Sequence, residues 1–442
     1  MSRRGANVTP AAGFGGENAE VEQETKQALP EIRVPAGWTF AGLAAGLAAG
    51  LALQGTSALP GMLAIAEPLG ALWLRALQMT ILPLVTALLF TGIIRTVAAA
   101  SAGAMARRTL TAFAALLAGG AIMAVLVMPL LLRAVPVPPA AAQALSGAGT
   151  AFAGPLPSLG DFVQSLIPAN IVEAAAQGAM LPVIVFTALF ALAATRLADA
   201  PRRRLAGLAE AIAGATMHVI GWVLALAPLG VFALALGVAA RSGTAAIGAL
   251  AHYIAAVSAI GAVVLLAAYA LAVGLARQRP AAFARAVLPA QAVAISTQSS
   301  LASLPAMLAA ARALGLRETS GEFVLPLAVA LFRATSPAMN LAVAIYVAQL
   351  TGVALTPAVL ASGLAVALLT TLGAPSLPGA ISFVTSVGPI ALAMGVPIGP
   401  LALLVAVEML PDIMRTLGNV TMDIAVTAWV DRKSSPAGSG SE

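Results

Sequence analysis

The sequence predicts an all-α polytopic membrane protein with eight transmembrane helices and two re-entrant helical hairpins. Of its 442 residues, 60% are hydrophobic and only 9% are charged, whereas a soluble domain usually carries about 25% charged residues. Apolar segments long enough for transmembrane helices recur along the chain. Towards the C-terminus, two of them are interrupted by Ser, Gly and Pro. Such interruptions predict backbone that turns back within the membrane, surrounded by protein or water.

The N-terminal part is expected to comprise a tail and six spans. Residues 1–34 are polar and lack periodicity, which predicts a disordered tail in the cytoplasm. Within residues 35–278, apolar segments occupy residues 38–54, 67–96, 110–133, 161–196, 206–239 and 245–276. Pro83 should kink the second segment, while Pro168 and Pro182 should break the fourth into several helices. The Pro-, Ala- and Gly-rich residues 135–158 predict an external loop.

Residues 279–431 show a different pattern and form the expected transport core. Its expected parts are a hairpin at 279–315, a span at 319–350, a hairpin at 355–392 and a span at 397–431, followed by a cytoplasmic tail at 432–442. The runs AISTQSSLASLPAML and TTLGAPSLPGAISFV interrupt the two hairpins. Paired interruptions in corresponding segments indicate a transporter binding site, and helix N-termini at the two tips favour an anion.

The last span carries a polar stripe that consists of Glu408, Asp412, Arg415, Asn419 and Asp423. At about 100° per residue, these positions fall within roughly 80° of one helix face. Three carboxylates and one guanidinium facing lipid would cost roughly 10 kcal/mol on insertion scales. The stripe should therefore face protein or a watery cavity, which indicates a functional site. The alternative is a structural seam between two helices, in which Asp412 and Arg415 neutralise each other.

The span at 319–350 carries a further charge. Arg333 lies near its middle, and Pro337 cannot donate a hydrogen bond to the Arg333 carbonyl. A broken helix with a buried cation is expected to line the same site as the stripe.

The loop charges indicate an orientation. With the N-terminus inside, most loop Arg residues fall on one side, and Arg133 and Arg241 lie in loops on the other. The positive-inside rule then places both termini in the cytoplasm of a multi-pass inner-membrane protein. Since the Arg residues are scattered and do not form one basic face, no nucleic-acid partner is expected. The expected surroundings are membrane lipid. With no Cys and two His, the chain lacks a pattern for zinc or haem, and no cofactor other than a coupling ion is expected.

Several of these motifs resemble the dicarboxylate/amino acid:cation symporter family, which includes the glutamate transporters. The similarity covers roughly residues 37–431. Residues 67–85 (EPLGALWLRALQMTILPLV) resemble the family's second span, and residues 167–186 and 227–237 resemble its fourth and fifth. STQSSLASLP (296–305) and GAPSLPGA (373–380) are similar to its two hairpin tips, and DIMRTLGNVTMD (412–423) matches its last span.

The resemblance implies a homotrimer that works by an elevator mechanism. Spans 1, 2, 4 and 5 would form a static scaffold that carries the trimer contact. Spans 3, 6, 7 and 8 and both hairpins would form a mobile transport unit, with the second hairpin as the outer gate.

The resemblance also implies a role for individual residues. Arg415 would pair with a distal carboxylate of the substrate, and Asp412 would take its amino group, if it has one. Other contacts would come from Thr416 and Asn419 on the last span and from the hairpin tips at Ser299, Ser300, Ala374, Pro375 and Ser376. Asp423, with Asn419 beside it, would be the candidate metal site for sodium.

One motif departs from the family's pattern. The seventh span normally carries Asn-Met-Asp-Gly-Thr, whose Asn and Asp ligate sodium, but here Phe332 and Ala334 replace these two ligands and Arg333 lies between them. Because a fixed cation repels sodium, Arg333 is hypothesised to supply the charge that bound sodium normally provides. It would pair with Asp423 or Glu408. The alternative is a purely structural Arg333.

Without those ligands, coupling would be to protons, carried by Glu408 or Asp412, or would be absent. The sequence thus predicts a secondary active transporter, a symporter, for a small anionic solute that is an acidic amino acid or a C4-dicarboxylate. A sodium-coupled dicarboxylate symporter and an anion channel or leak in the same fold are the alternatives. An enzyme is not expected, because no G-x-S-x-G or P-loop motif occurs. The acidity of Asp412 favours an amino-bearing solute, although Arg333 weakens that inference.

Overall fold

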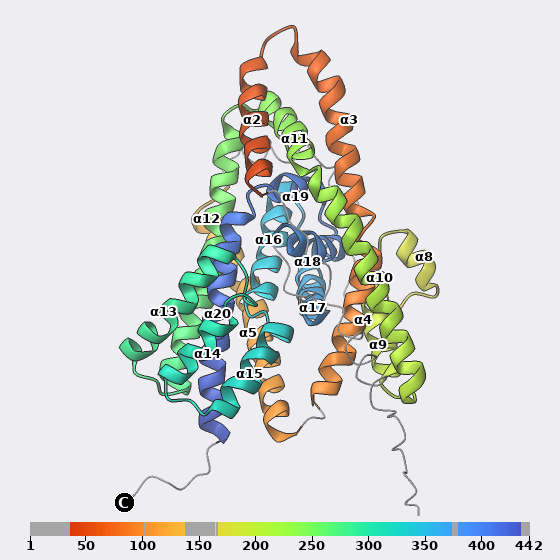
Figure 1. Ribbon diagram of the computed structural model, residues 1–442. Helices are drawn as coiled ribbons and strands as arrows, with labels where there is room; N and C mark the ends of the chain where they lie inside the picture. The colour runs from red at the N-terminus through yellow and green to blue at the C-terminus, as the bar shows by residue number, and fades with distance from the viewer. Residues whose placement is uncertain (1–35, 101–102, 138–163, 165–166, 374–378, 435–442) are drawn as a thin grey trace, which may run out of the picture. The chain divides into compact units, whose positions relative to one another are not determined.

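The computed structural model describes residues 36–100, 103–137, 164, 167–373 and 379–434. These residues belong to one compact unit, 32–442, and the elements they form are helices, with no strand among them (Figure 1). The predicted all-α fold class is therefore confirmed. The tail at 1–34, nearly all of the predicted external loop and the tip residues Ala374, Pro375 and Ser376 lie outside the described residues.

The N-terminal half contains nine described α-helices. These are α2 (Ala36–Leu53), α3 (Leu59–Gln78), α4 (Ile81–Ala100), α5 (Ala104–Ala134), α8 (Ile171–Ala176), α9 (Met180–Ala194), α10 (Asp199–Ala225), α11 (Ala227–Ser242) and α12 (Ala245–Ala270), which continues into the π-turn η1 (Leu271–Leu275). The second predicted span breaks between α3 and α4, because Pro83 has no N–H for the Met79 carbonyl. The stretch predicted as one span at 206–239 also breaks, at Leu226, since Pro228 cannot bond the Leu224 carbonyl.

The C-terminal part contains two helical hairpins and two broken helices. The hairpins are α13 (Pro280–Thr297) with α14 (Leu304–Ala313), and α17 (Pro357–Gly373) with α18 (Gly379–Ala393). The two helices of each pair pack against each other, so the chain reverses where the sequence predicts it to. The broken helices are α15 (Glu318–Leu331) with α16 (Ser336–Thr351), and α19 (Gly399–Leu404) with α20 (Met409–Ser434). The break before α20 corrects one expectation, because it leaves Glu408 just outside the helix that carries the rest of the stripe.

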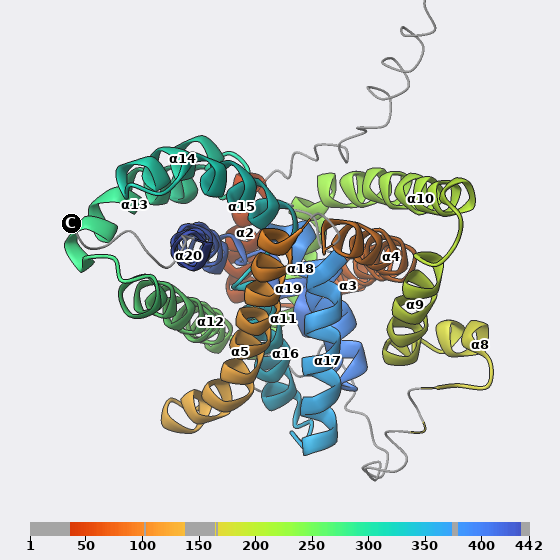
Figure 2. The same cartoon turned by 90° about the horizontal axis from the view of Figure 1, so that it is seen from below.

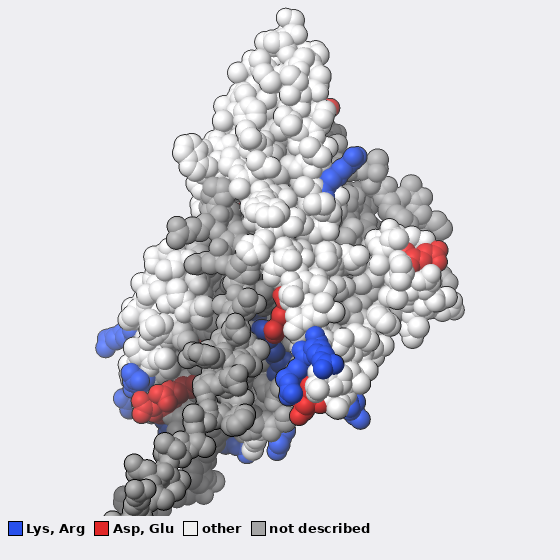
Figure 3. All heavy atoms as spheres, turned by 45° about the vertical axis from the view of Figure 1, so that its right-hand side comes forward, with Lys and Arg blue, Asp and Glu red and all other residues white. Residues whose placement is uncertain are grey.

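Five helical segments of the described chain are long and apolar enough to cross a membrane: Leu59–Ala100, Ala104–Ala134, Asp199–Ala225, Ala245–Leu275 and Glu318–Thr351. Shorter apolar helices accompany them, among them α9 and α17. On the face shown in Figure 3, Lys and Arg side chains gather mostly towards the lower end, and the upper part is almost free of charge. Together these features indicate a multi-pass membrane protein.

Helix α20 is the element around which the C-terminal part is packed. It contacts α12, α13, α14, α15 and α5, and it lies among them when seen from below (Figure 2). Elsewhere α11 packs on α2 and α3, while α4 packs on α9 and α10. The second hairpin packs against both the N-terminal and the C-terminal helices, since α17 and α18 contact α4 as well as α16.

Three glycines allow α2 to lie directly on the backbone of α11. A Cβ atom added at Gly42, Gly46 or Gly50 would come within 2.3, 2.4 or 2.6 Å of a carbonyl oxygen of α11, at Pro228, Phe232 and Leu236 respectively. Small residues at such spacing are what close packing of membrane helices requires. The packing of α2 therefore depends on these positions lacking a side chain.

Substituting Gly46→Ala should destabilise the protein by about 1–3 kcal/mol, because the new methyl group has to push two backbones apart. The control is Gly37→Ala on the same helix, where nothing lies within 4 Å of the added Cβ. It should leave stability unchanged or raise it slightly, since Ala is the better helix former. Thermal unfolding of the two detergent-solubilised variants measures the difference, and equal midpoints would contradict the packing.

Candidate functional site

The site is built around the break between α15 and α16. Phe332 leaves the helix in an extended conformation, and its ring stacks on Phe113 of α5 with a centroid separation of 4.2 Å. Pro337, near the start of α16, cannot bond the Arg333 carbonyl, which accepts from Ser336 N at 2.9 Å instead. The break predicted at Pro337 is therefore present, and it leaves residues 332–335 as buried, non-helical backbone.

Arg415 is the charged centre of the site, and its three nitrogens face three protein partners. Nη2 donates to Glu408 Oε1 at 2.5 Å, and Nη1 donates to Asn340 Oδ1 at 2.5 Å. Nε lies 3.1 Å from Asp412 Oδ1, an ion pair that lacks hydrogen-bond alignment. All four side chains are almost wholly buried. The predicted seam pair of Asp412 and Arg415 thus exists, but as one part of a larger network.

Glu408 is also held from the opposite side. Tyr253 on α12 is fully buried and donates from its hydroxyl to Glu408 Oε2 at 2.7 Å. The backbone oxygen of Glu408 accepts from Asp412 N at 2.9 Å, the first helical bond of α20. Glu408 therefore sits at the helix N-terminus and links α12 to Arg415.

Asn419 joins α20 to the broken helix. Its Oδ1 accepts from the backbone N of Thr335 and lies 2.9 Å from Thr335 Oγ1 as well. The approach is close because Gly418 has no side chain, and an added Cβ there would come within 2.5 Å of Thr335 Cγ2. Thr416, a second predicted substrate contact, donates instead to the Asp412 carbonyl at 3.0 Å.

Asp423 differs from the other carboxylates of the stripe. It is fully buried, and neither carboxylate oxygen has a hydrogen-bond partner among the described residues. A buried ion without a partner is costly, so a carboxylate here requires a cation or a proton. The expected pairing of Asp423 with Arg333 is not formed.

Arg333 is 8% exposed, and the charges that act on it are those of Arg415 and Asp412. The charges of Arg333 and Arg415 therefore both act on Asp412. The hypothesis that Arg333 pairs with Glu408 is not met either, because the two Glu408 carboxylate oxygens are bonded by Arg415 and Tyr253.

The tip of the first hairpin reaches the start of α20. Gln298 adopts a left-handed conformation there, and its side-chain amide lies 3.4 Å from the Met409 carbonyl. Ser299 Oγ accepts from Ala302 N at 3.2 Å, so this hydroxyl stabilises the turn of the tip. Ser299 and Ser300 are partly exposed. The tip is thus brought next to the stripe, whereas Ala374, Pro375 and Ser376 of the second tip are outside the described residues.

The side chains that remain do not fit the family's sodium ligand set. Phe332 and Ala334 offer no side-chain oxygen, and Asn419 Oδ1 is already engaged by Thr335. No group of three or more His, Cys, Asp and Glu among the described residues could hold a metal ion. Asp423 is left as the single carboxylate of the expected sodium site.

Sequence reasoning missed Tyr253 and Asn340, which complete the network. Each is a polar residue in an apolar stretch, and a lone buried polar group needs a partner. An isolated polar residue in an apolar stretch could therefore have been expected to have a buried partner, but the sequence does not identify that partner.

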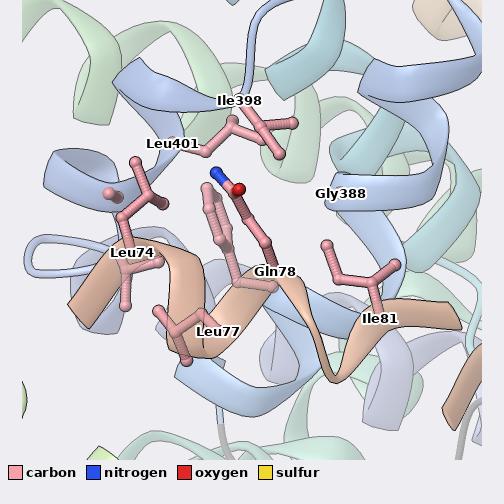
Figure 4. A pocket seen from close by; sticks show the side chains of 10 residues that line it. Leu74, Leu77, Gln78, Ile81, Gly388, Ile398 and Leu401 are labelled. Carbon is pink, nitrogen blue, oxygen red and sulfur yellow. The ribbon is translucent and has the colours of Figure 1, made fainter. Parts of the chain in front are cut away.

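A pocket lies apart from this network, between the elbow of α3 and α4 and the helices α18 and α19 (Figure 4). Figure 4 shows Gln78 pointing into it from α3, with Leu401 and Ile398 on the opposite wall. Apart from Gln78 its lining is apolar: Leu74, Leu77, Ile81, Phe383, Gly388, Ile398, Leu401, Ala402 and Val405. It marks an incompletely filled contact between the second span and the second hairpin.

Comparison with known proteins agrees with this architecture. The model of the sodium:dicarboxylate symporter family matches residues 36–433. The proton/glutamate-aspartate symporter of Escherichia coli K12 is 27% identical over 282 residues, or 62% of this chain and 64% of that protein. The proton/sodium-glutamate symport protein of Bacillus subtilis 168 is 26% identical over 385 residues, or 86% of this chain and 88% of that protein. A C4-dicarboxylate transport protein of Anaeromyxobacter sp. strain K is 28% identical over 382 residues, or 84% of this chain and 85% of that protein.

Helical spans, paired hairpins and a buried charged site between broken helices fit a membrane transport protein, and the matching family and its relatives indicate a transporter and not an enzyme. The chain belongs to the sodium:dicarboxylate symporter family, whose model covers most of its length.

Removing Arg415 should strongly destabilise the protein, because Glu408 and Asp412 would remain buried without their cation. We expect Arg415→Met to cost about 3–5 kcal/mol and Glu408→Gln in the same chain to restore part of that loss. The matched control is Arg312→Met, which removes an exposed ion pair with Glu318 and should cost at most about 1 kcal/mol. Thermal unfolding measures all three, and additive effects of Arg415→Met and Glu408→Gln would contradict the network.

Proposed function

We propose that this protein is a secondary transporter that carries a small dicarboxylate across the cell membrane together with a cation. The observation that supports this most strongly is Arg415, a guanidinium buried where the broken helix, the last span and the first hairpin tip meet. Arg presents a planar fork that matches a carboxylate, and the free N–H groups of nearby helix N-termini favour an anion. The relatives' names, glutamate-aspartate symporter and C4-dicarboxylate transport protein, describe solutes of this kind.

Within that class, a C4-dicarboxylate without an amino group is favoured over an acidic amino acid. An amino group would need the carboxylate of Asp412, but Arg415 lies 3.1 Å from it and the charge of Arg333 also acts on it. Two guanidinium groups that act on one carboxylate reduce its negative potential for an ammonium group. They suit a solute with two carboxylates instead.

The coupling cation is proposed to be a proton. Phe332 and Ala334 remove two sodium ligands, Asn419 is engaged, and Arg333 places a fixed cation nearby. Hard cations require several oxygen ligands, which these side chains do not provide. Protonation of a buried carboxylate needs no such ligand set.

Uptake of radiolabelled succinate into proteoliposomes tests this function. We expect uptake with choline in place of sodium, accelerated by an inward proton gradient, and competed more strongly by unlabelled succinate than by aspartate. Accelerated exchange against internal succinate distinguishes a carrier from an anion channel or leak. A strict requirement for sodium would contradict the role given to Arg333, and the absence of saturable uptake would contradict a transporter.

The proposed mechanism is an elevator within a homotrimer whose protomers have both termini in the cytoplasm. The scaffold would be α2–α4 and α8–α11, and the transport unit would be α5 and α12–α20. In the elevator, the contact between α4 and α18 beside the apolar pocket must slide. That contact is close, since a Cβ at Gly388 would lie 3.0 Å from Ile81 Cδ1.

A cross-link between these two helices should therefore stop transport. The chain has no Cys, so Ile81→Cys with Gly388→Cys creates a single defined pair. We expect oxidation or mercury to abolish succinate uptake by the double variant, and reduction to restore it. Each single variant, treated in the same way, should remain active. Full uptake by a completely cross-linked protein would exclude sliding at this contact.

A further inference from the structure

Arg415 already holds a carboxylate where a substrate carboxylate would have to bind. A bidentate ion pair with a guanidinium uses two neighbouring nitrogens, either Nη1 with Nη2 or Nε with Nη2. Both arrangements include Nη2, and Nη2 is bonded to Glu408 Oε1 at 2.5 Å. A substrate that binds Arg415 in this way must first displace Glu408.

Once displaced, the Glu408 carboxylate would have little to stabilise its charge. It is 0% exposed. The groups that act on it are Tyr253 from α12 and Arg415 and Asp412 from α20. From α16, Asn340 bonds Arg415, and Tyr346 stacks edge-on against Tyr253 at 5.4 Å. If Arg415 were taken by the substrate, Glu408 would face a neutral phenol and another carboxylate. Several kcal/mol oppose a buried ion in such surroundings.

We propose that Glu408 occupies Arg415 as an internal substitute for the substrate carboxylate, and that the substrate displaces it only when Glu408 takes up one proton. The proton comes from a hydronium ion of the aqueous phase, which is left as water, and it forms an O–H bond at the carboxylate as the Glu408–Arg415 ion pair breaks. The substrate carboxylate then forms the new ion pair. When the substrate leaves, Glu408 loses the proton and returns to Arg415, so one proton accompanies each substrate molecule. This inference rests on the proposed binding of a carboxylate by Arg415.

Tyr253 is the positioning residue in this exchange. Its hydroxyl donates to Glu408 Oε2, on the side away from Arg415. A hydroxyl can donate to a carboxylate and accept from a carboxylic acid. Tyr253 can therefore hold the Oε2 end of Glu408 in both protonation states while Oε1 leaves Arg415, and the exchange needs little movement of the backbone at the start of α20.

Succinate binding to the purified protein between about pH 5 and about pH 8 tests the exchange. For one proton per substrate, the apparent affinity of the wild-type protein should fall by about tenfold for each pH unit in the alkaline part of this range. In weakly buffered solution, a pH-indicator dye should report the uptake of about one proton per succinate bound. Glu408→Gln should bind succinate with no pH dependence and no proton uptake.

Tyr253→Phe separates positioning from simple structural support. It should still bind succinate, but its binding profile should move along the pH axis, because the ionised carboxylate loses a donor. The control is Tyr269→Phe on the same helix; the Tyr269 hydroxyl contacts Gln291 and lies outside the network. Its profile should match that of the wild-type protein.

The outcomes distinguish this inference from the proposed function. If the wild-type protein does not bind succinate or another C4-dicarboxylate at any pH, the proposed function is wrong. If it binds succinate but takes up no proton, or if Glu408→Gln keeps the wild-type pH profile, the exchange is wrong and the proposed function stands. A Tyr253→Phe profile identical to that of Tyr269→Phe would remove Tyr253 from the mechanism.

Discussion

The structure depends on one constraint: an ionised group that is taken out of water must have a partner of opposite charge. Arg415 meets it through Glu408 and Asp412, with Asn340 on its third nitrogen. The partners belong to α16, α20 and the turn before α20, so the ion pairs also fix how these elements meet. Losing the cation would leave two carboxylates buried, which is far more costly than losing a surface pair.

The constraint explains why the helices around the site are broken. A continuous helix uses its own backbone groups and offers none to a neighbour. At the gap between α15 and α16, the backbone N of Thr335 is free to donate to Asn419, and Gly418 lets the two segments approach closely. The break before α20 likewise places Glu408 where it reaches both Tyr253 and Arg415. The buried charged network and the irregular backbone therefore occur together.

Local sequence was enough to predict the helical fold, the two chain reversals and the break at Pro337, since each has a cause within a few residues. It was not enough to identify partners. Tyr253 lies 155 residues before Glu408, and the carboxylate that acts on Arg333 is that of Asp412 and not that of Asp423. The breaks at Leu226 and before α20 were also missed, since most residues in these short turns are as apolar as the helices beside them. Partners and short turns are fixed by tertiary packing, which spacing does not encode.

The balance of buried charge shows why an anion would not enter this site alone. When ionised, Glu408, Asp412 and Asp423 carry three negative charges, whereas Arg333 and Arg415 supply two positive charges. A dicarboxylate would add two negative charges to a site that is already negative when all three carboxylates are ionised. Removing such an excess from water is strongly unfavourable, so cations have to accompany the substrate. Because Phe332 and Ala334 provide no oxygen ligands for sodium, protons on buried carboxylates are the compensation that the side chains themselves can supply. Under the proposed function, coupling to a cation would then follow from the charge of the site.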